Sequence, residues 1–185
     1  METDDALLVR STREAGAFEP LVERHSGALH GYFARRAPGA ADDLLSEAWL
    51  QAFTARGTYD PERGTVRAWL FGVARNVLAA HWRGQERQSR VPHGDEVSSD
   101  PWHAVDRRLD AAAVAPLIRD TMAELPAVER ELMLLVAWEQ LSPTEAAAVM
   151  GVPAGTARSR LHRARTRLRT ALAPSDPKPL TGDLA

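Results

Sequence analysis

Residues 142–169 read SPTEAAAVMGVPAGTARSRLHRARTRLR, and they predict two helices joined by a tight turn. Ser142 and Glu145 have the spacing of a capping box, in which each side chain satisfies a free backbone N–H group at a helix start. Gly151 ends that short helix, and a second helix is expected over residues 155–172. This arrangement is typical of a helix-turn-helix, whose second helix enters the major groove of DNA.

The second of these helices has a one-sided charge pattern. Residues 158–169 contain six arginines and no acidic residue. On a helical wheel its apolar residues fall within about 80° and form a core seam, with arginines on both flanks and short polar side chains opposite. The alternative is a solvated surface helix, but such helices usually alternate in charge sign. The pattern therefore favours DNA binding.

Three further helices are predicted upstream, because apolar residues recur there at spacings of three and four. The first ends at the Pro38-Gly39 break, and the others cover residues 42–53 and 66–83. Periodicity is lost over residues 84–100, which are rich in Gly, Gln, Ser, Pro and charged residues. Because no strand pattern is present, the expected fold is all-α, with two small helical domains joined by a flexible linker and the helix-turn-helix in the C-terminal domain.

These patterns divide the chain into four expected segments. They are a helical domain at residues 14–83, a linker at 84–100, a helix-turn-helix domain at 101–173 and a disordered tail at 174–185.

Composition excludes several classes of function. The 185 residues contain no cysteine, so thiolate metal sites, cysteine nucleophiles and disulfides are excluded. The six histidines show no metal-binding spacing, and the chain has no nucleophile elbow or phosphate loop. The longest apolar run, residues 132–138, is far shorter than the ~20 residues needed to span a bilayer. We therefore expect a cytoplasmic protein that is not an enzyme, with no metal, no cofactor and no membrane insertion.

Two of the upstream helices have outward faces that suit a partner. The face of residues 42–53 mixes acidic residues with Leu50, which is either part of a docking surface or one of the scattered apolar residues found on any surface. Residues 66–83 place Trp69 near arginines and near Tyr59. Aromatic residues beside arginines suit unstacked nucleic-acid bases. The alternative for Trp69 is a place in the core.

Several separate motifs occur together in one order. They are DDLLSEAWLQAF at residues 42–53, YDPERG at 59–64, RAWLFGVARN at 67–76, LP at 125–126 and GTARSRLHRAR at 155–165. Together they resemble a bacterial RNA polymerase sigma factor of the extracytoplasmic-function (ECF) group. The resemblance covers about residues 18–172.

The resemblance implies a role for the N-terminal domain in binding both polymerase and DNA. One helix would dock on the clamp helices of the largest subunit of core RNA polymerase. Its matching residues are Asp42, Asp43, Ser46, Glu47, Leu50 and Gln51. A second set would recognise the minus-ten promoter element and hold an unstacked base. Its candidates are Tyr59, Arg63, Trp69, Arg75, Asn76 and Arg83.

The resemblance also implies that the C-terminal domain docks on the flap of the second-largest polymerase subunit and reads the minus-thirty-five element. Its candidates are Thr156, Arg158, Ser159, Arg160, His162, Arg163 and Arg165. Ser159, His162 and Arg163 would contact bases, whereas Thr156, Arg158 and Arg160 would hold phosphates. The family also implies an anti-sigma factor as a partner. The alternative from the residues alone is an autonomous two-domain helix-turn-helix regulator.

Overall fold

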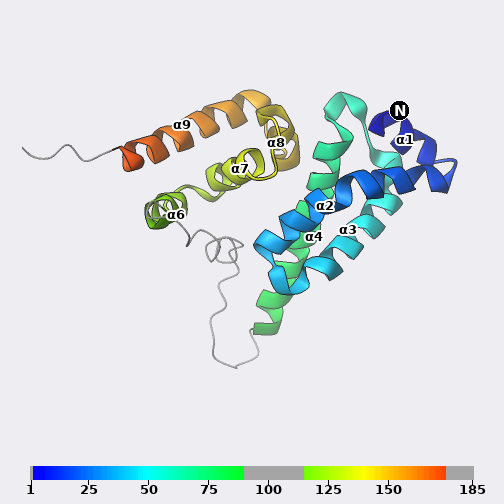
Figure 1. Ribbon diagram of the computed structural model, residues 1–185, viewed down its shortest axis with the longest axis horizontal. Coiled ribbons are helices and arrows are strands. Elements are labelled where there is room, and N and C mark those ends of the chain that lie inside the picture. The colour runs from blue at the N-terminus through cyan, green and yellow to red at the C-terminus, as the bar shows by residue number, and fades with distance from the viewer. Residues whose placement is uncertain (1, 90–114, 174–185) are drawn as a thin grey trace, which may run out of the picture.

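The computed structural model describes residues 2–89 and 115–173, which form eight α-helices and no strand (Figure 1). The N-terminal part contains α1 (Asp4–Ser11), α2 (Glu19–Arg36), α3 (Ala41–Ala55) and α4 (Val66–Ser89). The C-terminal part contains α6 (Ala115–Ala123), α7 (Ala127–Ala137), α8 (Pro143–Met150) and α9 (Ala154–Leu172). The predicted all-α fold class is confirmed.

Helices α2, α3 and α4 enclose the core of the N-terminal part. Phe33 from α2 and Phe71 from α4 are fully buried, and small residues such as Ala48 on α3 let the helices approach closely. The Tyr32 ring meets the edge of Phe71 at a centroid distance of 5.7 Å. Each large apolar side chain buried in this way contributes about 1.5–3 kcal/mol, so packing stabilises the three-helix unit.

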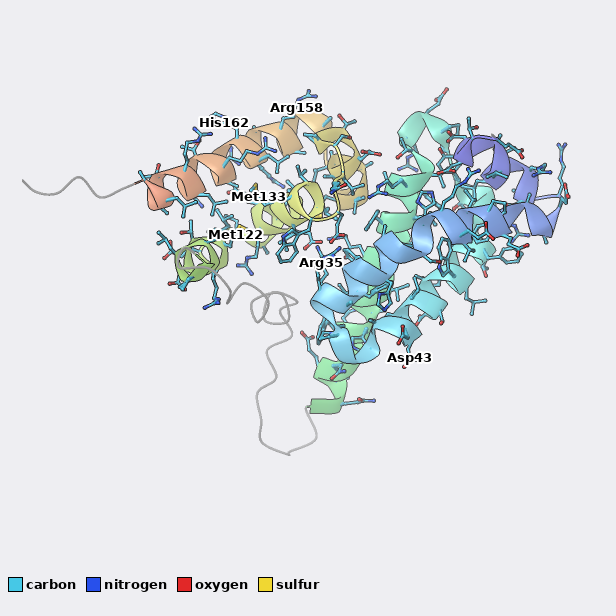
Figure 2. All side chains as sticks on the ribbon, viewed as in Figure 1. Arg35, Asp43, Met122, Met133, Arg158 and His162 are labelled. Atoms are coloured by element: carbon cyan, nitrogen blue, oxygen red, sulfur yellow. The ribbon has the colours of Figure 1, made fainter. Side chains whose placement is uncertain are left out.

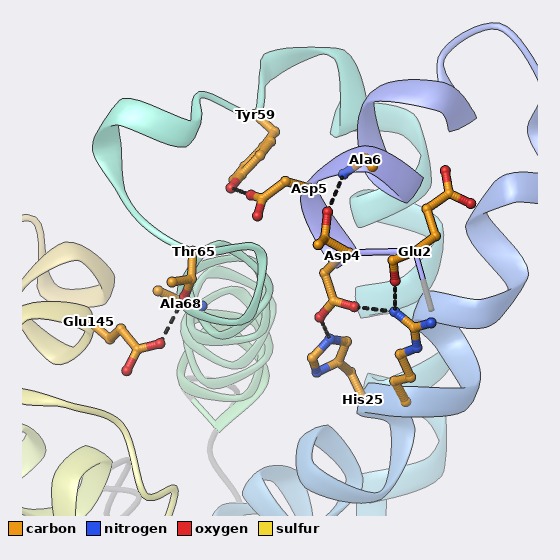
Figure 3. A network of polar contacts seen from close by, with 11 residues as sticks. Glu2, Asp4, Asp5, Ala6, His25, Tyr59, Thr65, Ala68 and Glu145 are labelled. Atoms are coloured by element: carbon orange, nitrogen blue, oxygen red, sulfur yellow. Dashed lines mark hydrogen bonds and ion pairs between the residues drawn. The ribbon is translucent and has the colours of Figure 1, made fainter.

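Helix α1 lies outside the predicted domain, which starts at residue 14, and no sequence pattern predicted it. It has only eight residues, too few for a stable isolated helix, so tertiary contacts must hold it in place. Asp4 pairs with Arg24 and with His25 of α2, both at 2.6 Å (Figure 3). Burial raises the pKa of Asp4, but hydrogen bonds from these two partners outweigh that effect and keep the pKa below its usual value.

The predicted end of the helix over residues 66–83 was wrong. Helix α4 continues to Ser89, past the expected end at residue 83, because the only residue there that disfavours a helix is Gly84, which costs about 1 kcal/mol. The rest of the predicted linker, the first residues of the predicted domain at 101–173 and the predicted tail lie outside the described residues.

The predicted helix-turn-helix is confirmed in its local geometry. The Ser142 hydroxyl accepts a bond from the Glu145 N–H at 3.2 Å, and the Glu145 carboxylate accepts one from the Ser142 N–H at 2.8 Å. Gly151 ends α8 in the left-handed region, with φ of 64°. In α9, Leu161 is buried as expected, but Leu172 is exposed, so the core seam ends before the last turn.

The two parts of the chain pack against each other, with α8 beside α4 (Figure 1). Arg36, at the end of α2, is fully buried and pairs with Glu139 at 2.8 Å and with Glu131 at 3.3 Å. Its guanidinium lies 3.9 Å from the centre of the Tyr32 ring. Burial lowers the pKa of Arg36, but the neighbouring carboxylates raise it by a larger amount. The net pKa is therefore above the ordinary value, and this side chain stays charged. A buried ion pair therefore joins the two parts.

None of the helices in the described ranges is both long enough and apolar enough to cross a membrane.

Candidate functional site

The outward face of α3 carries all of the predicted polymerase-binding residues, and each of them is exposed. Leu50 is 68% exposed, an unusual position for a large apolar side chain in the middle of a helix. Gln51 donates a hydrogen bond to Glu47 at 2.9 Å, so these two residues hold each other on the surface. Figure 2 shows Asp43 projecting away from the neighbouring helices. The face combines one apolar side chain with several carboxylates.

A cleft of about 840 Å³ lies between α4 and the turn of the helix-turn-helix. Five of the six predicted minus-ten residues line it, namely Tyr59, Arg63, Trp69, Arg75 and Asn76. Residues 147–153 of α8 and the following turn form the opposite wall. Arg83 is exposed farther along α4 and does not line the cleft. The structure therefore brings together every member of this predicted set except Arg83.

Tyr59 is held in the cleft by the N-terminal helix. Its hydroxyl lies within hydrogen-bond distance of the Asp5 carboxylate and of the Gly64 carbonyl, the latter at 3.0 Å (Figure 3). Burial raises the pKa of Tyr59, and the hydrogen bond to Asp5 raises it further, so the hydroxyl remains a donor. Its ring meets the Trp69 ring edge-on at 6.0 Å. Trp69 is half-buried, so it both packs on the core and lines the cleft.

The capping residue of α8 also contacts the N-terminal part. The Thr65 hydroxyl, just before α4, donates to the Glu145 carboxylate at 2.8 Å (Figure 3). Burial raises the pKa of Glu145, but hydrogen bonds from Ser142 and Thr65 outweigh it and keep the pKa below the ordinary value. Nearby, Arg67 donates to the Glu139 carbonyl at 2.7 Å. One wall of the cleft is thus attached to the other through charged and polar contacts.

Helix α9 presents most of the predicted minus-thirty-five residues to solvent. Figure 2 shows Arg158 and His162 on the side of α9 turned away from α6 and α7. Thr156 and Arg160 are half-buried, and the other predicted members are exposed. Arg163 differs from Arg158, because its guanidinium forms an ion pair with Glu129 of α7 at 3.2 Å. No ion pair to Arg158 occurs within the described part of the chain.

Sequence reasoning missed four residues that hold these sites in place. Asp5 lies 54 residues from Tyr59, Glu129 lies 34 residues from Arg163, and Arg36 lies 103 residues from Glu139. Local periodicity cannot predict pairs of residues that are so far apart in the sequence. One signal was available, because Glu129 lies three residues before the buried Leu132, on the apolar side of α7. An acidic residue in that position indicates a cationic partner.

The described residues contain no group of three side chains that could hold a metal ion.

Comparison with known families matches both parts of the chain. The family model for sigma-70 region 2 matches residues 21–88, and the model for sigma-70, region 4 matches residues 116–168. A probable RNA polymerase sigma-C factor of Mycobacterium bovis is 38% identical over 146 residues, covering 78% of this chain and 75% of the relative. RNA polymerase sigma-E factor of Streptomyces coelicolor is 32% identical over 161 residues, covering 86% and 88%.

Solved structures agree with this assignment. A structure of CnrH in complex with the cytosolic domain of CnrY matches with a TM-score of 0.62 at 26% identity, covering 94% of this chain and 100% of that chain. A sigma factor of Bartonella quintana, RpoE, solved with the anti-sigma factor NepR, shares the fold at 21% identity and a TM-score of 0.58, covering 86% and 98%.

The helical architecture and these matches define a sigma factor, a class of transcription initiation factor. The chain belongs to the ECF group of RNA polymerase sigma factors. It is a DNA-binding, promoter-recognition subunit of RNA polymerase that serves in transcription initiation.

Proposed function

We propose that the two parts of the chain divide promoter recognition between them. The domain at residues 14–83 binds core polymerase and the minus-ten element, and the domain at residues 101–173 reads the minus-thirty-five element. The observation that carries the proposal is the separation of the candidate residues into an acidic face on α3, a cleft beside α4 and an arginine-rich face on α9.

The α3 face suits a basic and partly apolar helical partner. Leu50 supplies apolar area at its centre, and the carboxylates of Asp43 and Glu47 supply charge around it. Apolar anchors with charged surroundings are typical of protein interfaces, in which the anchor contributes affinity and the charges speed association. The proposed partner is the pair of clamp helices of the largest polymerase subunit.

The cleft beside α4 suits an unstacked base of the melted minus-ten strand. Trp69 and Tyr59 offer aromatic surface, on which one stacked base contributes about 1–3 kcal/mol. Arg75 and Asn76 add hydrogen-bond donors on the same wall. Arg83 lies farther along α4, where it would contact the backbone of the strand.

The α9 face suits duplex DNA. Ser159, His162 and Arg163 would contact bases, while Thr156, Arg158, Arg160 and Arg165 would hold phosphates on both sides. The three arginines of this set have no ion pair within the described residues, so their charges can neutralise phosphates without first leaving a protein partner. We also propose that this domain docks on the flap of the second-largest polymerase subunit.

Further partners follow from the relatives. CnrH was solved in complex with the cytosolic domain of CnrY. By analogy, we propose that an anti-sigma factor holds this chain inactive in the cytoplasm. We assign it no catalytic activity, metal or cofactor of its own.

Transcription in vitro with core polymerase on genomic fragments tests the proposal. The chain should direct initiation at a defined set of promoters only when core polymerase is present. An autonomous regulator would instead bind duplex DNA alone, usually as a dimer on a palindrome, and that outcome would overturn the proposal.

A further inference from the structure

Glu129 is an acidic residue buried beneath the arginine-rich helix. It lies in the first turn of α7 and is only 6% exposed. Its Oε1 accepts hydrogen bonds from Arg163 Nε at 3.3 Å and from Arg163 Nη2 at 3.2 Å. Its Oε2 lies 3.8 Å from Arg167 Nη1 and has no hydrogen-bond partner in the described residues. Glu129 therefore forms hydrogen bonds with Arg163, whereas its contact with Arg167 is a longer ion pair.

The contact leaves one edge of the Arg163 guanidinium unused. A guanidinium has five N–H donors, and Glu129 engages only the Nε donor and one of the two on Nη2. The remaining donors, on Nη1 and Nη2, form the edge that matches the O6 and N7 acceptors of guanine. Arg163 is 56% exposed, so this edge is accessible.

We propose that Glu129 is a positioning residue for promoter recognition, which holds Arg163 in the orientation from which its free edge reads a guanine of the minus-thirty-five element. The inference rests on the proposed function of α9. A side chain that is already fixed loses less conformational freedom on binding. Ordering a long side chain on binding weakens the affinity by roughly 2- to 12-fold. Because Glu129 orders Arg163 before DNA binds, it avoids this loss of affinity.

The position of Glu129 is otherwise difficult to explain. A carboxylate beneath a DNA-binding helix reduces the positive potential that attracts phosphates, and its burial costs free energy. Arg163 and Arg167 are equally exposed, at 56% and 55%, but Glu129 accepts hydrogen bonds only from Arg163. Arg167 therefore serves as the matched control.

The test compares holoenzyme binding to promoters that carry each single-base change in the minus-thirty-five element. Glu129→Met keeps the side-chain size but removes both acceptors, and it should reduce the preference for guanine at one position by about 2- to 12-fold. Arg163→Ala should abolish the preference at that same position. The double variant should discriminate no worse than Arg163→Ala alone. Glu129→Gln, which keeps one acceptor oxygen, should retain part of the preference, and Arg167→Ala should leave it unchanged.

Two outcomes separate the inference from the function on which it rests. If wild-type holoenzyme prefers guanine at a position where Glu129→Met and Glu129→Gln keep the full preference, the inference is wrong and the proposed function stands. The same holds if these variants lower affinity equally for all bases. If wild-type holoenzyme shows no base preference anywhere in the element, the proposed function of α9 fails, and the inference fails with it.

Discussion

At the scale of single residues, the charged side chains fall into two groups that differ in burial. Arg36 is fully buried and paired with Glu139, and removing either partner would leave an uncompensated charge in the interior. Arg158 and Glu47 are exposed, and solvent screens them. Substitution in the first group should therefore affect folding, whereas substitution in the second should affect partners.

The exposed face of α3 gives the first prediction. Leu50→Ala and Glu47→Lys should each change the free energy of unfolding by less than about 0.5 kcal/mol, because both side chains are exposed. Both should weaken binding to core polymerase in a direct affinity measurement. Val9→Ala is the matched control, since Val9 is 60% exposed on α1 and away from this face. Unchanged polymerase affinity in both α3 variants would refute the assignment of α3.

Arg158 gives the second prediction. If it holds a phosphate, Arg158→Ala should weaken holoenzyme binding to all minus-thirty-five sequences about equally. The slope of log affinity against log salt concentration should become shallower by about one, since about one fewer counterion is released. The measurement is a salt titration on several promoter variants. A change in preference at a single base position would instead show that Arg158 reads sequence, and the proposed rotation of α9 in the groove would be wrong.

At the scale of elements, α8 is defined at both ends by local chemistry. The capping box starts it, and Gly151 ends it in a left-handed conformation that other residues rarely adopt. The same Glu145 carboxylate also accepts a bond from Thr65 in the other part of the chain. Glu145 thus both caps the start of α8 and joins α8 to the N-terminal part.

Glu145 gives a prediction about pH. Its pKa in the folded protein is below the ordinary value of 4.5, so the unfolded chain binds its proton more readily. The stability that the carboxylate contributes is therefore present above about pH 4.5 and is lost as the pH falls through the lower folded pKa. Wild type should be more stable than Glu145→Ala near neutral pH, and the difference should shrink in acid.

Urea unfolding at several pH values measures this difference. Thr54→Ala is the control, because within the described residues the Thr54 hydroxyl donates only to the Leu50 carbonyl, at 2.8 Å, and the variant should show a difference independent of pH. A stability gap for Glu145→Ala that stays constant down to about pH 3 would contradict the assigned role of the charge.

At the scale of the whole molecule, the closed packing of the two parts conflicts with simultaneous contact to two promoter elements. Two turns of duplex span roughly 70 Å, whereas α8 packs directly against α4. The proposed division of promoter recognition therefore predicts that the parts separate on the promoter. Their interface combines one continuous apolar cluster, which includes Leu70 and Ala147, with a buried ion pair between Arg36 and Glu139, and water can solvate these charges once the parts move apart.

An engineered crosslink tests this separation. A Cβ atom added at Gly64 would lie 3.5 Å from the Ala148 Cβ, within the range of about 3.5–4.5 Å that a disulfide requires. The chain has no cysteine of its own. The Gly64→Cys, Ala148→Cys variant should therefore form a single bond between the two parts when oxidised. Its promoter-dependent initiation should be lost on oxidation and restored on reduction.

The single-cysteine variants are the controls, and Gly64→Cys alone also reports the strain of placing a side chain at a φ of 149°. Both should initiate equally with and without oxidant. Normal initiation by protein that is fully crosslinked on a non-reducing gel would show that the parts need not separate.

Much of the fold could be predicted from sequence, because its signals act over a few residues. Apolar spacings of three and four located α2 and α3, and the spacing of Ser142 and Glu145 located the start of α8. Helix α1 was missed because it is short, and docking onto α2 stabilises it. The end of α4 was placed too early because one glycine does not stop a helix.

The sequence by itself thus determined the all-α class, the helix-turn-helix and which residues of α3 face outward, since all of these depend on helical periodicity and capping. Only the tertiary structure decided which charges are buried and which partners they have. The pairing of Arg36 with Glu139, and of Arg163 with Glu129, requires segments far apart in the chain to approach. The strength of such pairs depends on burial from water, which no local spacing encodes.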